Sequence, residues 1–565
     1  MAKVISIGNQ SFESIREKDN FYIDKTNFIR EWWDNDDTVT LITRPRRFGK
    51  TLNMSMLECF FSNKYKDRGD LFEGLEIWND EKYRKLQGTY PVIFLSFAEI
   101  KQNNYNDAVE KIKRIICEVC QQFDFLKNWD GLTEIEKKNI SNISYNMSDV
   151  MAQDLIKNMS NYLSRYYGKK VIILLDEYDT PMQEAYVNGY WEELVAFTRS
   201  LFNSTFKTNP YLERAIMTGI TRVSKESIFS DLNNLKVITV TSDEYSKCFG
   251  FTEDEVFAAL DEQGLSSEKE KVKLWYDGFT FGDEKDVYNP WSIINFLDEK
   301  KYKTYWADSS SNGLVNELIR TGSAEIKKTM ETLIAGGTVE KNIDEQIVFE
   351  QLKTNKDAVW SLLLASGYLR VETFRTEGRL NKKIYSLKLT NYEVEQMFGT
   401  MIERWFGGAD VPYNEFINAM LNGDIESMNE YMNRVTRGVI SYFDTGKTPS
   451  DEEPERFYHG LVLGLMVEQV DNYILNSNRE SGYGRYDIML EPIDKTNEKY
   501  PGIVIEFKVI NPRKENTLEE TVAAALKQIE EKNYDAELVK RGVKEENIHH
   551  YGFAFRGKEV LLDGR

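Results

Sequence analysis

The stretch from Val39 to Leu52 constrains the fold of this chain more than any other. It opens with a short apolar, β-branched run, Val39–Thr43, which ends in a proline-containing turn. Gly49-Lys50-Thr51 follows and leads into a helical pattern. A strand, a loop and a helix, with Gly-Lys-Thr where the loop meets the helix, are the context that a phosphate-binding loop requires. The stretch therefore predicts an α/β fold in which this loop holds a phosphate group.

The loop offers two kinds of group to a nucleotide. Backbone N–H groups at a helix N-terminus carry a partial positive charge and can surround phosphates. The Lys50 ammonium is predicted to reach the β- and γ-phosphates, and the Thr51 hydroxyl to bind Mg2+. The alternative is a chance Gly-Lys-Thr at the start of a helix. The predicted nucleotide-binding residues of the loop are Arg46, Arg47, Phe48, Gly49, Lys50, Thr51 and Leu52.

One position departs from the usual Gly-x4-Gly-Lys-Thr pattern, because Arg44 stands where the first glycine belongs. A residue with a side chain disfavours positive φ, so we expect the loop to open differently from the usual form. Arg46 and Arg47 could compensate through additional guanidinium contacts with phosphate.

A second stretch, Lys170–Asp179, complements the loop. Five consecutive apolar residues precede Asp176 and Glu177, which predicts a buried parallel strand with carboxylates at its C-terminal end. Ligands in open α/β sheets bind at that end of the strands. Asp176 is predicted to hold Mg2+ directly or through water, and Glu177 to orient or deprotonate the attacking water. The alternative is that these acids only cap the next element.

A further predicted core strand, Arg214–Ile220, contains Thr218 and is followed by Thr221 and Arg222. In P-loop ATPases the strand beside the acidic strand often carries a polar residue that senses the γ-phosphate. Thr218 or Thr221 could do this, and Arg222 could contact phosphate. An ordinary strand-end turn explains the same residues equally well.

The composition limits partners and location. A net charge of −20 excludes a uniformly basic nucleic-acid-binding surface, so any nucleic-acid contact must use a local basic patch. Four cysteines are too few for a disulfide framework and favour a reducing cytoplasm. Cys117 and Cys120 fit a helix core better than a zinc site. No signal peptide is evident, and no apolar run approaches the ~20 residues that span a bilayer, so we expect no membrane association.

Changes of pattern along the 565 residues divide the chain into regions, as expected for about three to four domains. Alternating strands and long helices at the start predict a P-loop NTPase parallel sheet covered by helices. A helical lid, a mostly helical middle region and a C-terminal α/β region follow. The predicted boundaries are 1–249, 250–320, 321–445 and 446–565.

Two of these regions carry local signals. The lid begins with a capping box formed by Thr252 and Glu255. In the middle region, a helix over Val359–Leu369 followed by a β-ribbon indicates a winged-helix-like module. Its charge is mixed, which favours a role in bridging domains over DNA reading. A polar segment with two prolines, 444–455, is predicted to be the linker before the last region.

The last region holds a second cluster of chemically competent residues. Asp487 lies at the start of one predicted strand, and Glu506 and Lys508 alternate with apolar residues in the next, Gly502–Val509. The period of two places Glu506 and Lys508 on one face. Asp487 and Glu506 are hard oxygen ligands for Mg2+ or Mn2+, which polarise a scissile phosphate and lower the pKa of bound water. Lys508 would position that water or neutralise the transition state.

Helices on either side extend this cluster. Glu468, on the preceding predicted helix, could supply an outer carboxylate ligand, and Gln528 lies on the following helix, Leu518–Lys532. The alternative is a Glu/Lys ion pair on a solvated strand, which the apolar opposite face and the preceding Asp487 disfavour. The ordered set predicts metal-dependent cleavage of phosphodiester bonds.

These motifs resemble the bacterial family that joins an AAA-ATPase-like domain to a C-terminal PD-(D/E)XK nuclease-superfamily domain. An arginine in place of the first loop glycine is a common feature of that family. The resemblance implies ATPase roles for Lys50, Thr51, Asp176 and Glu177, and nuclease roles for Asp487, Glu506 and Lys508. The resemblance assigns roles to Glu468 and Gln528 less directly, because they lie on predicted helices and residue positions on helices shift easily between relatives. The matching stretches are Tyr22–Thr26, Arg44–Thr51, Leu175–Asp179, Thr218-Gly219, Tyr288–Ser292, Ser477–Asp487 and Ile505–Lys508.

Two functions are compatible with these residues. The first is an ATP-binding and ATP-hydrolysing, metal-dependent nuclease under nucleotide control. Its cofactors are ATP and Mg2+, with Mn2+ as an alternative at the nuclease site, and its partner is nucleic acid, DNA being favoured over RNA. The second is a nucleotide-switched binding or signalling protein with a silent nuclease fold, which the acidic composition favours. Homo-oligomerisation is compatible with either.

Overall fold

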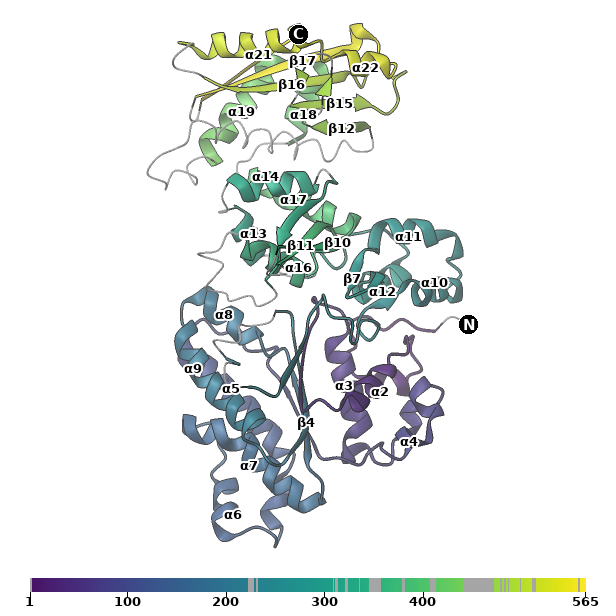
Figure 1. Cartoon of the computed structure of the whole chain (residues 1–565), viewed down its shortest axis with the longest axis vertical. Helices are drawn as coiled ribbons and strands as arrows, with labels where there is room; N and C mark the ends of the chain where they lie inside the picture. Colours follow the sequence, from purple (N-terminus) through teal and green to yellow (C-terminus); the bar gives the residue numbers. More distant parts are fainter. Residues whose placement is uncertain are drawn as a thin grey trace. The chain divides into compact units, whose positions relative to one another are not determined.

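A computed structural model gives the fold of the chain (Figure 1). It divides into two compact units, Met1–Ser309 with Glu340–Glu393, and Ser310–Val339 with Val394–Arg565. The structure describes residues 3–221, 228–229, 232–307, 309, 313–320, 324–334, 336–344, 357–378, 382–406, 413–439, 472–477, 480–481, 484–485, 487–497, 499–510, 515–556 and 559–565.

The first unit is built on a five-stranded parallel sheet with strand order β2-β3-β4-β1-β5. Every residue of β1 and β3 is buried, as their apolar runs predict. The strands are β1 (Val39–Thr43), β2 (Val92–Ser96), β3 (Val171–Asp176), β4 (Leu212–Gly219) and β5 (Leu235–Ile238).

Helices cover both faces of this sheet, which confirms the predicted layered α/β fold (Figure 1). On one face lie α2 (Asn27–Asn35) and α3 (Lys50–Phe61), and on the other lie α5 (Tyr105–Gln121), α7 (Asp149–Tyr167) and α9 (Trp191–Phe202). Trp32 of α2 and Met54 of α3 share one apolar core with strand residues such as Ile172. The other α-helices of this region are α1 (Phe12–Glu17), α4 (Glu81–Arg84), α6 (Glu134–Ser141) and α8 (Thr180–Asn188).

A small subdomain that follows the sheet corresponds to the predicted lid. The capping box is confirmed: the Thr252 backbone N–H donates to Glu255 Oε2 at 2.7 Å, and the Thr252 hydroxyl accepts from the Glu255 N–H. Glu255 also pairs with Lys25 at 2.7 Å, which ties the N-terminal segment to this subdomain. Its elements are β6 (Phe251–Thr252), α10 (Glu253–Glu262), α11 (Lys269–Tyr276), β7 (Phe279–Phe281), β8 (Glu284–Tyr288) and α12 (Pro290–Glu299).

The middle of the chain contains the helix and β-ribbon that the sequence predicts. Helix α16 (Ala358–Ala365) precedes the antiparallel pair β10 (Leu369–Glu377) and β11 (Lys382–Leu389), with β9 (Val339–Asn342) as a third strand. Helix α17 (Tyr392–Phe406) then starts in the first unit and continues into the residues of the second. The helices α13 (Gly313–Arg320) and α14 (Ala324–Ile334) belong to the second unit.

The second unit contains a mixed five-stranded sheet of order β12-β15-β16-β17-β18, in which only β16 and β17 pair in parallel. Helices α18 (Tyr413–Asn422) and α19 (Ile425–Val439) cover one face, and α21 (Leu518–Lys532) covers the other (Figure 1). The remaining elements are β12 (Tyr473–Ser477), β15 (Ile488–Pro492), β16 (Gly502–Val509), β17 (Ile548–Arg556), β18 (Glu559–Gly564) and α22 (Ala536–Lys540).

The predicted strand around Asp487 is interrupted. Gly484–Arg485 forms β14, which pairs with β13 (Glu480–Ser481), and β15 begins at Ile488. Asp487 therefore lies in the break, directly before β15. The predicted linker 444–455 and the helix predicted after it lie outside the described residues. Within the described ranges, every helix is too short or too polar to span a lipid bilayer.

Candidate functional sites

The P-loop connects β1 to α3 at the carboxyl end of the parallel sheet. Helix α3 starts at Lys50, and its N-cap Gly49 has a left-handed φ of 77°. The other left-handed residue of the loop is Arg47, with φ 66°. Arg44 is not among the residues with positive φ. The loop therefore opens differently from the usual form, as expected, because its left-handed residues lie further along than position 44.

The Arg44 side chain is fully buried and turns away from the loop. Its guanidinium donates to the carbonyl oxygens of Thr43 at 3.1 Å, of Thr239, and of Glu244 at 3.4 Å. It also lies 4.5 Å from the centre of the Phe281 ring. Burial lowers the pKa of Arg44 to about 10, so the group stays charged at neutral pH. Arg44 therefore fastens the start of the P-loop to the segment that follows β5.

Restoring the usual glycine with Arg44→Gly is expected to destabilise the first unit by about 3 kcal/mol, because three carbonyls lose a donor and the ring contact is lost. The measurement is the unfolding midpoint by differential scanning calorimetry. Arg46→Gly is the control, since Arg46 is exposed and a change of only about 0.5 kcal/mol is expected there. Equal midpoints for Arg44→Gly and the wild type would contradict this structural role.

Lys50 is buried, with 4% of the residue exposed. Its ammonium group donates to the carbonyl oxygens of Arg44 at 3.0 Å and Pro45 at 2.9 Å. Burial lowers the pKa of Lys50, and the carboxylates of Glu177 and Asp176 oppose this shift. Lys50 is thus held within the loop by two of the three hydrogens that an ammonium group carries.

Asp176, at the end of β3, joins the P-loop to the neighbouring strand. Its Oδ2 accepts from the Thr51 hydroxyl at 2.7 Å, and its Oδ1 accepts from the Thr218 hydroxyl at the end of β4. Asp176 is fully buried, which raises its pKa. The two stretches singled out in the sequence therefore meet in space, with Glu177 beside them in a left-handed conformation of φ 52°. The Glu177 carboxylate accepts from the Thr180 hydroxyl at 3.0 Å.

Asp179 also belongs to this site, although no role was predicted for it from the sequence. It is buried, and its Oδ2 accepts from the backbone N–H groups of Ile220 at 3.0 Å and Thr221 at 2.9 Å, and from the Thr221 hydroxyl at 3.0 Å. Asp179 therefore fixes Thr221 next to the acidic strand. In the sequence, the signal that could have identified Asp179 was its position three residues after Asp176. Arg222 lies outside the described residues.

The outer side of the P-loop contacts the lid. The Arg46 carbonyl accepts from the Trp306 indole N–H at 3.0 Å and from the Asn289 amide at 3.3 Å. The Arg47 guanidinium lies 4.2 Å from the centre of the Trp291 ring, and the Phe48 ring packs edge-on against the lid residue Phe279. These aromatic side chains of the lid therefore support the loop, and the Phe48 ring contributes to packing.

The second cluster lies on the face of the C-terminal sheet that α21 covers. Glu506 is buried, and its Oε1 accepts from the Gln528 amide of α21. The Gln528 oxygen accepts from Lys508 Nζ at 2.6 Å. The Asp487 carboxylate accepts from the backbone N–H of Phe507, the residue between Glu506 and Lys508, at 2.8 Å. The structure thus brings these four polar residues together.

Packing on both sides of β16 explains this arrangement. Ile505 and Phe507 point into the apolar core shared with α18 and α19, so Glu506 and Lys508 face α21. Helix α21 can approach the sheet closely because position 552 of the neighbouring strand is a glycine. A Cβ there would lie 3.0 Å from the Val522 carbonyl oxygen.

Tyr534 is a further member of the cluster that the sequence argument missed. Its hydroxyl accepts from the Gln528 amide at 3.2 Å, and only 1% of the residue is exposed. Burial raises the pKa of Tyr534, and the Glu506 and Asp487 carboxylates raise it further. Tyr534 follows the end of α21, where no periodic pattern marks it. Glu468, the predicted outer ligand, lies outside the described residues.

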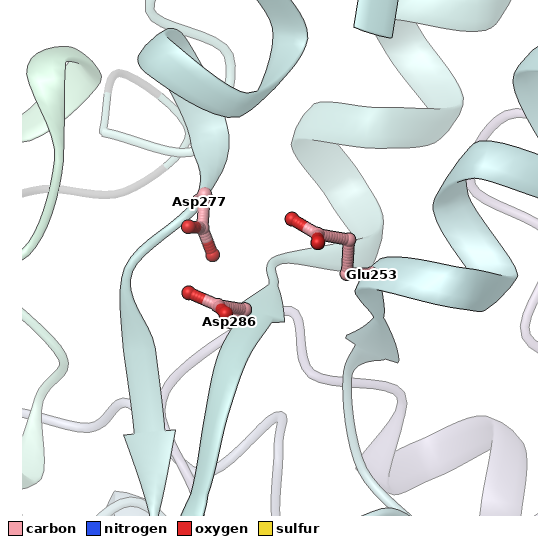
Figure 2. Close-up of side chains that lie close together, drawn as sticks. All are labelled: Glu253, Asp277 and Asp286. Carbon is pink, nitrogen blue, oxygen red and sulfur yellow. The ribbon is translucent and has the colours of Figure 1, made fainter. Parts of the chain in front are cut away.

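A third polar cluster lies in the lid, where the carboxylates of Glu253, Asp277 and Asp286 converge (Figure 2). One oxygen from each lies within 4.8 Å of the others. Lys273 pairs with Glu253 and lies 3.9 Å from Asp286, and the Tyr288 hydroxyl donates to Glu253 at 3.2 Å. Burial, followed by the Asp286 carboxylate, raises the pKa of Asp277 to about 7. We interpret the cluster as acids neutralised by Lys273 and by a proton on Asp277.

This raised pKa makes the stability of the lid depend on pH. Folded Asp277 keeps its proton up to a pKa of about 7, whereas the unfolded residue releases it near 3.8, so its stabilising contribution is lost as pH rises across that window. Because Asp277 is partly exposed, the expected decrease in the free energy of unfolding across this pH window is on the order of 2 kcal/mol. Thermal unfolding at pH 5 and pH 8 should show a smaller difference for Asp277→Asn than for the wild type. Asp283→Asn, at an exposed position nearby, should behave like the wild type.

The two sites and their sheets indicate which classes of protein the chain resembles. A parallel sheet with Gly-Lys-Thr after β1 and an acidic pair at the end of β3 is the arrangement of P-loop ATPase-like proteins, and the C-terminal mixed sheet has the acidic and lysine residues of a nuclease-like fold. Residues 6–229 match the family described as "Predicted AAA-ATPase", and residues 453–563 match the PD-(D/E)XK nuclease superfamily. The chain is therefore similar to AAA-ATPase-like proteins over the first of these regions and to the nuclease superfamily over the second.

The chain is also similar to a bacterial protein. An "uncharacterized protein in vnfD 5'region" of Azotobacter chroococcum mcd 1 is 25% identical over 396 residues, which cover 70% of this chain and 68% of the relative.

Proposed function

We propose that this protein binds and hydrolyses ATP and that its C-terminal region cleaves phosphodiester bonds of nucleic acid, with a metal ion and under nucleotide control. The observation that carries the proposal is the cluster of Asp487, Glu506, Lys508 and Gln528 on a chain that also holds a P-loop. We also propose the domain boundaries 1–249, 250–320, 321–445 and 446–565.

At the P-loop, the residues present suit a magnesium nucleotide. Lys50 has one ammonium hydrogen beyond the two that it donates to loop carbonyls, and this hydrogen can reach a phosphate oxygen. Thr51 and Asp176 already share a hydrogen bond and together offer the hard oxygen donors that would hold Mg2+. That ion, when bound, neutralises charge on the phosphates. Glu177 is the proposed residue that orients or deprotonates water for ATP hydrolysis.

In the nuclease-like cluster, Asp487 and Glu506 are the proposed ligands for Mg2+ or Mn2+, with Glu468 as a proposed outer ligand. The donor set is oxygen only, as these ions prefer. The metal, when bound, polarises a scissile phosphate and lowers the pKa of water. Gln528 hydrogen-bonds both the Glu506 carboxylate and the Lys508 ammonium. Lys508 is the proposed group that neutralises charge developing on the phosphate.

The proposed partner is nucleic acid because the C-terminal region matches a nuclease superfamily, and DNA is proposed ahead of RNA. The chain has an overall charge of −20, so binding must rely on local basic groups such as Lys508. A cytoplasmic location is proposed because the chain has four cysteines and all four are free thiols.

A second candidate function is a nucleotide-switched binding or signalling protein whose nuclease fold is silent. The net charge of −20 favours it, because an acidic surface repels nucleic acid. This alternative predicts nucleotide binding without cleavage, and no binding of manganese through Asp487 and Glu506.

The experiment that separates the two incubates the full chain with plasmid and single-stranded DNA in Mg2+ or Mn2+, with and without ATP. The proposal expects cleavage that EDTA abolishes and that ATP changes in rate. Manganese calorimetry on the same preparation gives an independent readout. Absence of cleavage under every condition, together with absence of manganese binding, would favour the silent alternative.

A further inference from the structure

The first turn of α17 is anchored in the first unit by a buried carboxylate. Glu393, the second residue of α17, is fully buried. Its Oε1 accepts from the backbone N–H groups of Trp306 at 2.6 Å and Ala307 at 3.4 Å, and its Oε2 accepts from the Ser292 hydroxyl at 2.8 Å. Because hydrogen bonds to a charged acceptor are short and strong, these donors fix where α17 begins.

Trp306 connects this carboxylate to the P-loop. Its backbone N–H donates to Glu393, while its indole N–H donates to the Arg46 carbonyl at 3.0 Å. Only 3% of Trp306 is exposed, and its ring packs edge-on against Phe279 at 5.5 Å. A displacement of the Arg46 carbonyl therefore acts on the Trp306 side chain, and the backbone N–H of the same residue holds Glu393.

A second route joins the same two ends. The Asn289 amide donates to the Arg46 carbonyl at 3.3 Å. The Asn289 side-chain oxygen caps α12 by accepting from the N–H groups of Trp291 at 2.9 Å and Ser292 at 3.3 Å. The Ser292 hydroxyl then donates to Glu393. Both routes thus start at one carbonyl of the P-loop and end at one carboxylate of α17.

We infer that these contacts couple nucleotide occupancy of the P-loop to the start of α17. The inference rests on the proposed nucleotide binding. Arg47 lies against Trp291 at 4.2 Å, and a nucleotide phosphate competes with that ring for its guanidinium. The nucleotide therefore favours a different set of contacts between loop and lid, which is the condition for shifting a conformational equilibrium.

The coupling has a direction along the chain and a reciprocal effect. Glu393 is the last residue of the first unit, and α17 carries the polypeptide from it into the second. Coupling between two sites is reciprocal. A change in the contacts that hold Glu393 therefore changes the affinity for nucleotide by the same factor by which the nucleotide changes the equilibrium of those contacts. Glu393 and Trp306 are positioning residues, since they act through the Arg46 carbonyl.

The test measures amide hydrogen exchange of residues 392–401 in the full chain, with and without a non-hydrolysable ATP analogue. We expect the analogue to change the exchange rates of wild-type α17 by about 5-fold or more. Trp306→Phe keeps an aromatic ring and removes the indole N–H, which interrupts the first route only, so the effect of the analogue on the exchange of α17 should be smaller than in the wild type. Glu393→Gln acts where both routes end, and in this variant the effect of the analogue should fall below 2-fold, roughly the level at which coupling is lost.

Trp275→Phe is the matched control, because the Trp275 ring also packs on α17, 4.8 Å from Tyr392, and is not one of the residues that form either route. It should keep the wild-type response. Calorimetry with the analogue separates the two hypotheses. If the wild type binds no analogue, the proposed function fails and the coupling with it. If it binds and the exchange of α17 is unchanged, or if Trp306→Phe and Glu393→Gln both respond like the wild type, only the coupling is overturned.

Discussion

Lys50→Met is expected to lower the affinity for ATP by about 100-fold or more. The ammonium group is held within the loop by two carbonyl oxygens, at 3.0 and 2.9 Å, so it is positioned before a nucleotide arrives. A charged hydrogen bond to phosphate contributes on the order of 3 kcal/mol in a site sheltered from water, which corresponds to about 100-fold in affinity. Methionine keeps most of the apolar stem and removes this donor.

Isothermal titration calorimetry with a non-hydrolysable ATP analogue checks this expectation. Lys66→Met is the control, because Lys66 is an exposed lysine of the same unit and should leave affinity unchanged. The variant also leaves the Arg44 and Pro45 carbonyls without their donor, at a cost of about 1–3 kcal/mol in stability. Circular dichroism at the titration temperature must therefore confirm that it is folded. Wild-type affinity in folded Lys50→Met would exclude the proposed nucleotide site.

Glu506→Gln is expected to reduce metal-dependent cleavage by about 100- to 1000-fold. The substitution preserves size and removes the charge that a divalent ion requires. It also places an amide opposite the Gln528 amide that donates to Glu506 Oε1, so the orientation of Gln528 toward Lys508 is disturbed as well. Both effects act on the same reaction, which makes this the largest expected loss at the second site.

Conversion of supercoiled plasmid in Mn2+ measures this effect. Glu491→Gln is the matched control, because Glu491 is also a buried carboxylate of the same sheet but pairs with Lys495 and Arg541. It should retain cleavage. Equal cleavage by Glu506→Gln and the wild type would show that any nuclease activity comes from other residues or from a contaminant.

The sequence was informative wherever the signal was local. The strand, loop and helix around Lys50 and the capping box of Thr252 and Glu255 depend on neighbours within a few residues, and the structure contains all of them. The alternation of Glu506 and Lys508 likewise predicted one polar face, because a strand has a fixed period of two.

The residues that were missed depend on partners far away along the chain. Arg44 finds its acceptors at Thr239 and Glu244, about 200 positions later, so its buried role could not be inferred from the loop itself. Tyr534 joins the second cluster only because α21 ends beside it. Glu393 acquires its role from residues 292 and 306, which no periodic pattern connects to it. The break before β15 was missed because Asp487 and its flanking residues alternate as a strand would.

One measurement tests the central claim most directly: the rate of plasmid cleavage in Mn2+, with and without ATP, for the wild type and Asp487→Asn side by side. The account predicts that the wild type cleaves at a rate that ATP changes, and that Asp487→Asn cleaves at least about 100-fold more slowly in both conditions. Equal rates for the two proteins, or no cleavage by either, would contradict it.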